Sequence, residues 1–182
     1  MNNTTPIILK TLELRHEQMA VDLYENAFPY KERRPSDKWL EYFHTNSKFC
    51  IKSILLDDSF TGFLSYWDFD NFIYIEHFAT LPSVRGLGLG GTSIDLFKES
   101  QPLRPIILEV EPPTDEITKR RINFYSRHGF HLIPNDYEQP SYHEGGTSFP
   151  LLIMCNDKNF ALNQFKSIVR VLHQNVYGVI FE

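Results

Sequence analysis

The chain contains little cysteine and has no strong excess of charge. Only two cysteines, Cys50 and Cys155, occur among 182 residues, too few for a disulfide framework or a cysteine-based zinc site. Both lie in apolar runs, so we expect buried thiols. The formal net charge is −5, which disfavours a broadly basic surface. We therefore expect no nucleic-acid partner.

Long apolar runs are absent as well. No basic region followed by an apolar run opens the sequence, and nowhere do about eighteen apolar residues follow one another. We expect no secretory signal, no membrane partner and a cytoplasmic protein. Hydrophobic residues make up 42% and charged residues 23% of the chain, which is typical of a globular protein. Its length favours one domain over residues 1–182.

Apolar periodicity and turn residues predict alternating strands and helices. The turns at 57–59 and 68–71 indicate an antiparallel meander, and Gly129 closes a helix. The expected class is α/β, a mixed, mostly antiparallel central sheet flanked by helices. The expected strands are 7–14, 48–56, 60–67, 72–80, 105–111, 130–134 and 149–155, and the expected helices are 16–28, one from Ser36, 88–100, 115–128 and 159–176.

The most informative segment is the glycine-rich turn over 81–91, between an expected strand and an expected helix. It carries four glycines within six residues, and Arg85 precedes them. Glycine backbone can present successive N–H groups to an anion, and the following helix adds the positive end of its dipole. Such a turn suits a pyrophosphate.

Two nucleotide types fit this turn. The glycines satisfy the dinucleotide fingerprint Gly-x-Gly-x-x-Gly, and Glu109 or Glu111 lies about twenty residues on. Against that alternative, residues 82–85 separate the strand from the glycines, and the motif follows three antiparallel strands. A phosphate-binding loop with Gly-Lys-Ser/Thr is absent.

The segment Pro82-x-x-Arg85-Gly86-x-Gly88-x-Gly90 resembles motif A of the GNAT superfamily of acetyl-CoA-dependent N-acetyltransferases. The preceding strand at 74–80 resembles the family's fourth strand, 107–110 its fifth, and Phe124-Tyr125-x-x-x-Gly129-Phe130 the end of its fourth helix. Together these segments cover roughly residues 72–130. The resemblance implies a GNAT-like acyl-CoA N-acyltransferase fold.

The resemblance also implies a site for acetyl-CoA, used as a cosubstrate without a metal. Backbone N–H groups of the glycine turn would hold the pyrophosphate, with Arg85 beside it. The strand end would bind the pantetheine amides and polarise the thioester carbonyl. The expected cofactor-binding residues are Phe78, Ala79, Thr80, Arg85, Gly86, Leu87, Gly88, Leu89, Gly90, Gly91 and Asn123.

Two catalytic residues follow from the same resemblance. Tyr125 matches the family's tyrosine near the sulfur and is the candidate general acid, since a tyrosine keeps its proton at neutral pH. Glu76 is the candidate base that takes the amine proton. Because side chains alternate along a strand, we expect His77 to point away from Glu76, so that only one of them faces the site.

Other polar residues are less diagnostic. Many family members carry Asn and Ala where this chain has Thr118 and Arg121, so Arg121 is a candidate to face the substrate. The histidines form no convincing metal site. The segments 28–34 and 136–148 are candidates to line the acceptor pocket.

The sequence thus predicts an acyltransferase that moves an acetyl group from acetyl-CoA to a primary amine on a small molecule or protein, by direct transfer in a ternary complex. The alternatives are a catalytically silent CoA-binding or regulatory domain and a dinucleotide-binding oxidoreductase. Two placements are open for the terminal helix and the run 179–181. They cover the sheet of their own domain, or they pack on a second copy in a homodimer.

Overall fold

The computed structural model describes residues 6–180, which form two compact units. Within the described residues, unit 1 runs to Tyr30 and continues from Pro35 to Arg104. Unit 2 takes Lys31–Arg34 and the chain from Pro105 onward. The single domain over residues 1–182 stays a prediction.

Unit 1 is built on an antiparallel meander. Its strands are β1 (Ile7–Thr11), β2 (Phe49–Leu56), β3 (Ser59–Asp68) and β4 (Ile73–Thr80), each paired with the next. Most residues of the strands β2 to β4 are buried, as expected of strands covered on both faces. The predicted meander is confirmed.

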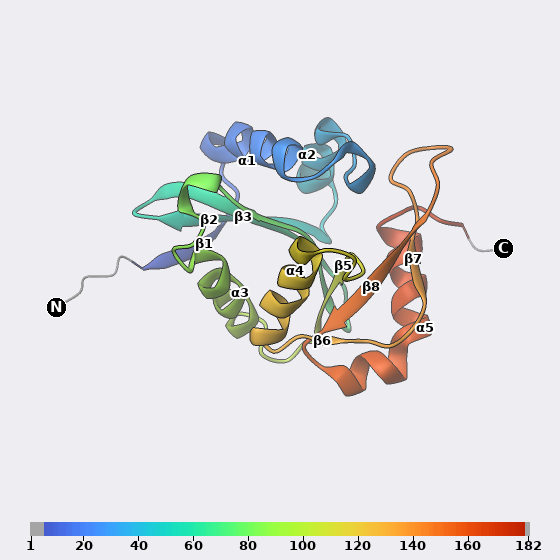
Figure 1. Cartoon of the computed structure of the whole chain (residues 1–182). Coiled ribbons are helices and arrows are strands. Elements are labelled where there is room, and N and C mark those ends of the chain that lie inside the picture. The colour runs from blue at the N-terminus through green and yellow to red at the C-terminus, as the bar shows by residue number, and fades with distance from the viewer. Residues whose placement is uncertain (1–5, 181–182) are drawn as a thin grey trace. The chain divides into compact units, whose positions relative to one another are not determined.

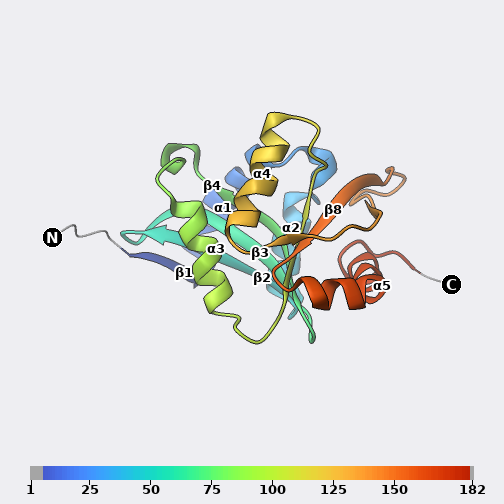
Figure 2. The same ribbon diagram turned by 60° about the horizontal axis from the view of Figure 1, so that its bottom comes forward.

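Helices cover both faces of this meander. The helices α1 (Leu14–Ala27) and α2 (Ser36–Thr45) lie on one face and α3 (Leu89–Glu99) on the other (Figures 1 and 2). Beneath the first pair, the rings of Tyr24 and Trp39 stack with centroids 4.3 Å apart, and Phe63 of β3 meets Trp39 edge-on at 5.1 Å. Packing between these large rings stabilises the contact of the two helices with the sheet.

Unit 2 contains four strands and two helices. Its central strand is β8 (Phe149–Cys155), which pairs antiparallel with β5 (Ile106–Val110), β6 (His131–Leu132) and β7 (Tyr137–Gln139). The helices α4 (Glu116–Arg127) and α5 (Lys158–Asn175) lie on opposite sides of these strands (Figure 2). Short 3-10 helices occupy Tyr30–Glu32 and Pro82–Val84.

Local sequence signals explain the ends of α4. The Asp115 side chain accepts a hydrogen bond of 2.8 Å from the Thr118 N–H, and the Thr118 hydroxyl accepts one of 3.1 Å from the Asp115 N–H. This reciprocal capping holds the first turn. Gly129 has φ +82°, in the left-handed region that ends a helix, as predicted.

The structure confirms the α/β class with mostly antiparallel strands flanked by helices and corrects some details. The strand β7 was not predicted, because three residues inside a Gly-, Pro- and Tyr-rich loop show no periodicity. Cys155 is buried as expected, whereas Cys50 is only half-buried. Among residues 6–180, none of the helices has both the length and the apolar character needed to span a bilayer.

The terminal helix α5 buries one stripe, which includes Ala161, Ile168 and Leu172. Ile180 beyond it is 89% exposed, and Phe181 lies outside the described residues. The homodimer stays a prediction.

Gly62 of β3 lies against the end of β4. A Cβ atom added there would come within 2.5 Å of the Ala79 carbonyl oxygen and 3.0 Å of the Thr80 Cα. Both are backbone atoms, which cannot move aside without shifting the strand. The absence of a side chain at Gly62 therefore permits the close approach of β3 to the last residues of β4.

We expect Gly62→Ala to lower the free energy of unfolding by about 1–3 kcal/mol, the usual cost of overpacking. Urea denaturation measures the change. Ser59→Ala, at the exposed start of the same strand, is the control and should change stability by less than about 0.5 kcal/mol. A Gly62→Ala protein as stable as the parent would show that the strands separate without cost.

Candidate functional site

The glycine turn of unit 1 has the conformation that the sequence predicts. Gly86 and Gly88 have φ +80° and +79°, and Gly88 is the residue that caps the N-terminus of α3. A Cβ added at either position would meet nothing within 4 Å, so the turn is open on these sides. Arg85 is exposed beside it. The backbone therefore takes a left-handed shape that favours glycine and leaves room for a bulky group.

The helix that follows adds further backbone donors. Leu89, Gly90 and Gly91 form the first turn of α3, and the first bond within the helix runs from the Thr92 N–H to the Gly88 carbonyl at 3.1 Å. The N–H groups in the first turn of an α-helix have no partner within that helix. Together with the positive dipole end, they can hold an anion.

The segment Phe78–Thr80, just before the turn, stays paired with β3 to the last residue of β4. Leu64, Phe63 and Gly62 are its successive partners in the ladder. In such a ladder only part of the backbone groups of each strand face the neighbouring strand. The remaining N–H and C=O groups point away from β3.

Glu76 and His77 are brought together by a β-bulge. Ser65 pairs with His77 and the next residue, Tyr66, pairs with Ile75, so Glu76 is an extra residue in β4. The Glu76 Oε2 lies 3.7 Å from the His77 Nδ1, and their side chains are 0% and 3% exposed. The expectation that His77 points away from Glu76 is wrong, because a bulge interrupts the strict alternation of side chains.

The candidate acid Tyr125 and the candidate ligand Asn123 belong to α4 in unit 2. Tyr125 is 8% exposed and meets the rings of Phe124 and Phe130 edge-on. Burial raises the pKa of Tyr125 to about 12, although the nearby Arg121 charge opposes the rise. The hydroxyl therefore stays protonated at neutral pH. Asn123 lies on the exposed face of the same helix.

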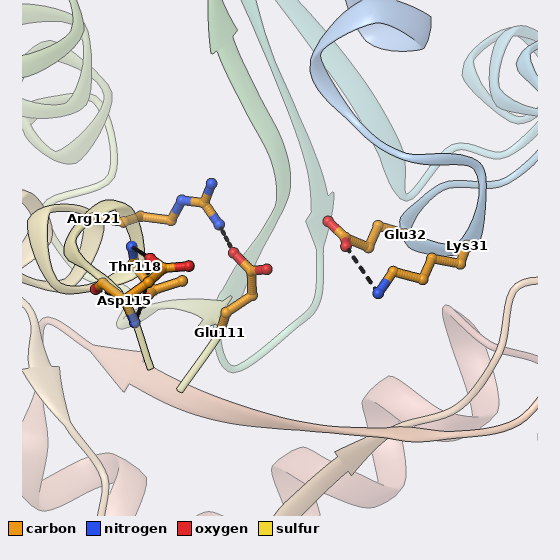
Figure 3. A network of polar contacts seen from close by, with 6 residues as sticks. All are labelled: Lys31, Glu32, Glu111, Asp115, Thr118 and Arg121. Atoms are coloured by element: carbon orange, nitrogen blue, oxygen red, sulfur yellow. Dashed lines mark hydrogen bonds and ion pairs between the residues drawn. The ribbon is translucent and has the colours of Figure 1, made fainter. Parts of the chain in front are cut away.

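A network of charged side chains in unit 2 includes Arg121 (Figure 3). Arg121 forms an ion pair with Glu111, the residue after β5, and Lys31 lies 3.7 Å from Glu32. Figure 3 shows the carboxylates of Glu111 and Glu32 pointing toward each other. Arg121 thus has a carboxylate partner within the chain, which the sequence did not reveal.

Within this network, the surroundings of Glu32 disfavour the charged form of its carboxylate. Partial burial raises the pKa of Glu32, the negative charge of Glu111 raises it further, and the charges of Lys31 and Arg121 lower it. Two carboxylates that face each other favour a cation between them.

A further carboxylate in unit 2 is that of Glu109 in β5. Its carboxylate accepts hydrogen bonds from the hydroxyls of Tyr137 and of Tyr177, the latter at 2.8 Å. Burial and the Glu109 charge raise the pKa of Tyr137 above its ordinary value. The guanidinium of Arg34 lies 5.0 Å from the ring centroid of Tyr142. Within the candidate segment 136–148, Tyr137 is thus a buried member of a polar network.

The proposed site residues divide between the two units. Unit 1 holds the glycine turn, Arg85, the segment Phe78–Thr80 and Glu76. It also holds His77, which was not among the predicted site residues and lies next to Glu76. Unit 2 holds Asn123 and Tyr125. Across the part of the chain that the structure describes, no three histidine, cysteine, aspartate or glutamate side chains gather in a way that could hold a metal ion.

Residues 16–130 of the chain match the family model described as "Acetyltransferase (GNAT) family". A GNAT-family protein of Bacteroides thetaiotaomicron with a solved structure is 40% identical, with a TM-score of 0.89, over 95% of this chain and 99% of that one. YjbC of Bacillus subtilis (strain 168), to which acetyltransferase activity is ascribed, is 39% identical over 69 residues. That match spans 37% of this chain and 35% of YjbC.

More distant solved structures share the fold. The ribosomal-protein-S18-alanine N-acetyltransferase of Escherichia coli has a TM-score of 0.59 at 15% identity, over 82% of this chain and 92% of its own. A chimera of spermidine N-acetyltransferase SpeG from Vibrio cholerae and hSSAT has a TM-score of 0.62 at 15% identity, over 86% and 98%. The expected GNAT-like fold is confirmed.

We expect Glu32→Gln to raise stability at pH 7 and to lose that gain at pH 4. The raised pKa of Glu32 means that the folded state binds its proton more tightly than the unfolded state. Glu32 therefore lowers the free energy of unfolding as the pH rises through its folded pKa, and glutamine removes this loss. Urea denaturation at both pH values measures the difference.

The control for this prediction is Glu144→Gln, at an exposed position of the same unit. It should change stability equally little at pH 7 and pH 4. A Glu32→Gln protein that is less stable than the parent at pH 7 would show that the pair with Lys31 outweighs burial and the charge of Glu111.

Proposed function

Because the chain belongs to the GNAT acetyltransferase family, we propose that it moves an acetyl group from acetyl-CoA to a primary amine by direct transfer in a ternary complex. The family generally uses acetyl-CoA, and acyl transfer is the activity its members share. The acceptor, the mechanism and the roles of individual residues belong to the proposal.

The observation that carries the proposal is the glycine turn with its left-handed Gly86 and Gly88 and the first turn of α3 behind it. A pyrophosphate needs several N–H donors on a surface without side chains, and this turn provides both. Arg85 adds a positive charge at the rim. We assign the pyrophosphate of acetyl-CoA to the N–H groups over 86–91.

The pantetheine arm is assigned to Phe78–Thr80. Its amides would bind backbone groups of this segment that point away from β3. An N–H group there would also donate to the thioester carbonyl oxygen and stabilise the negative charge that develops on it. Asn123 of α4 is assigned to the same ligand on the family resemblance alone.

The chemical steps use Glu76 and Tyr125. Glu76 takes one proton from the ammonium, and the neutral nitrogen attacks the thioester carbonyl carbon to form a C–N bond. The C–S bond then breaks, and Tyr125 gives its proton to the departing thiolate. The nitrogen loses its second surplus proton, which restores the tyrosine. The products are the N-acetylated amine, CoA thiol and one proton held by Glu76.

Direct transfer is supported by the state of the cysteines. Neither cysteine lies in the segments that resemble the family, and burial raises the pKa of Cys155 to about 11. A thiol with that pKa is almost entirely protonated at neutral pH and is a poor nucleophile. An acyl-enzyme on Cys155 is therefore disfavoured.

The acceptor is proposed as a protonated primary amine on a small molecule or a protein. The facing carboxylates of Glu32 and Glu111 favour a cationic group (Figure 3). Glu32 lies in the segment 28–34 that the sequence singled out for the acceptor. The alternative, a silent CoA-binding domain, would bind the nucleotide without turning over any amine.

We expect Gly88→Val to weaken CoA binding by tenfold or more, about 1.4 kcal/mol or greater. The valine side chain would enter the open space over the turn and strain a residue at φ +79°. Isothermal titration calorimetry with CoA measures the change. Gly178→Val places the same strain at φ +69° in unit 2 and should keep the affinity of the parent. A folded Gly88→Val protein with unchanged affinity would contradict the assignment.

We expect Tyr125→Phe to keep CoA affinity and to lower kcat roughly ten- to ten-thousandfold, the range of general acid catalysis. Because the pKa of Tyr125 is about 12, its hydroxyl holds the proton throughout the accessible range. The parent should therefore show no fall in kcat from this group up to pH 10. Tyr42→Phe in unit 1 is the control. An unchanged kcat in Tyr125→Phe would mean that another group protonates the thiolate.

A further inference from the structure

The bulge in β4 creates a pair of ionisable groups that strict strand alternation would separate. Glu76 is the extra residue, since its neighbours Ile75 and His77 pair with the consecutive residues Tyr66 and Ser65 of β3. The carboxylate and the imidazole consequently meet at 3.7 Å, through Oε2 and Nδ1. Bulges of this kind re-aim a side chain, and they are common next to active sites.

Burial makes this pairing energetically important. The Glu76 side chain has no exposed surface and the His77 side chain is 3% exposed. A carboxylate removed from water loses its hydration and takes up a proton unless a donor or a cation stands beside it. A glutamate that is already protonated cannot accept the proton of an ammonium. A neighbouring donor or cation can keep Glu76 ionised, and the structure places the imidazole of His77 next to it.

Aromatic rings fix the imidazole in this position. Tyr24 and Phe28 of unit 1 meet the His77 ring edge-on, with centroids 4.9 and 4.6 Å away and interplanar angles of 85° and 77°. These ring contacts therefore hold the imidazole in one orientation.

We propose that His77 is a positioning residue for Glu76: its Nδ1–H faces the carboxylate, keeps it ionised at neutral pH and holds it in place. This inference rests on the proposed function, in which Glu76 accepts the amine proton. No bond is made or broken in the pairing itself. The proton that Glu76 later accepts comes from the ammonium, and His77 keeps its own.

Other titratable and charged groups lie on the elements packed against β4. From α1 the titratable group that faces His77 is Tyr24, and from β3 the residue opposite it is Ser65. The charged residues of α3, the other helix packed on β4, include Asp95 and Lys98, which lie 3.5 Å apart and pair with each other. The carboxylate of Glu76 is a charged partner of His77, at 3.7 Å.

The experiment measures both proton affinities in the full chain. Carbon-13 NMR of side-chain-labelled glutamate and histidine follows Glu76 and His77 against pH, with Glu76→Gln and His77→Phe assigning the signals. We expect His77→Phe to raise the pKa of Glu76 by about one unit, a tenfold change in proton affinity. Glu76→Gln should lower the pKa of His77 by the same amount, because the coupling between two sites is one quantity.

Matched variants separate pairing from packing. His77→Phe keeps a ring between Tyr24 and Phe28, while His77→Asn keeps an N–H donor near the position of Nδ1 and should restore part of the shift. His16→Phe changes the other buried histidine of unit 1, which packs on Phe60 at 5.7 Å, and should leave Glu76 unchanged. The titration of His77 in Glu76→Gln needs no change at His77, so it decides the question even if His77→Phe fails to fold.

The outcomes distinguish this inference from the function it rests on. An unchanged Glu76 in His77→Phe, or an unchanged His77 in Glu76→Gln, overturns the positioning role. Acetyl transfer to a panel of primary amines, followed by release of CoA thiol, tests the base role separately. In Glu76→Gln the rate should fall most where the amine is protonated. Reciprocal shifts together with a Glu76→Gln rate equal to the parent would instead overturn the base role.

Discussion

A single extra residue in β4 places a carboxylate and an imidazole together in the interior of unit 1. The insertion at Glu76 breaks the two-residue alternation of the strand, so Glu76 and His77 meet at 3.7 Å with almost no exposed surface. Burial in the protein interior disfavours the charged form of a carboxylate and of an imidazole when either lacks a partner. In our proposal this pairing keeps Glu76 ionised, and the proposed chemistry depends on that carboxylate.

The end of β4, the glycine turn and the start of α3 follow one another along the chain in unit 1. After the bulge, β4 stays paired with β3 through Thr80, and Gly62 allows this close approach because it has no Cβ. The chain then enters the turn in which Gly86 and Gly88 take left-handed conformations, and α3 begins. In the proposed function, the backbone groups of the strand end, the turn and the first turn of the helix supply the donors for acetyl-CoA.

Three carboxylates of unit 2 have hydrogen-bond or ion-pair partners within the same unit. Glu109 accepts from two tyrosine hydroxyls, Glu111 pairs with Arg121, and Glu32 pairs with Lys31. The pairing at Glu32 is incomplete, because its pKa is raised by burial and by the charge of Glu111. A charged group that costs stability in the folded state is more often found at a functional site than elsewhere. This imbalance is the physical basis on which we propose a cationic acceptor.

Periodicity, turn residues and glycine placement determined most of the fold and the cofactor motif from the sequence alone. Local sequence patterns, formed by residues a few positions apart, determine the meander, the helix that follows the glycines and the end of α4 at Gly129. Contacts between distant residues were decided only by the tertiary structure. These include the three-residue strand β7, the partners of Glu109, the pair of Arg121 with Glu111, and the bulge that joins Glu76 to His77. A bulge arises from the register between two strands, and register depends on how both strands pack, so no pattern within 73–80 could reveal it.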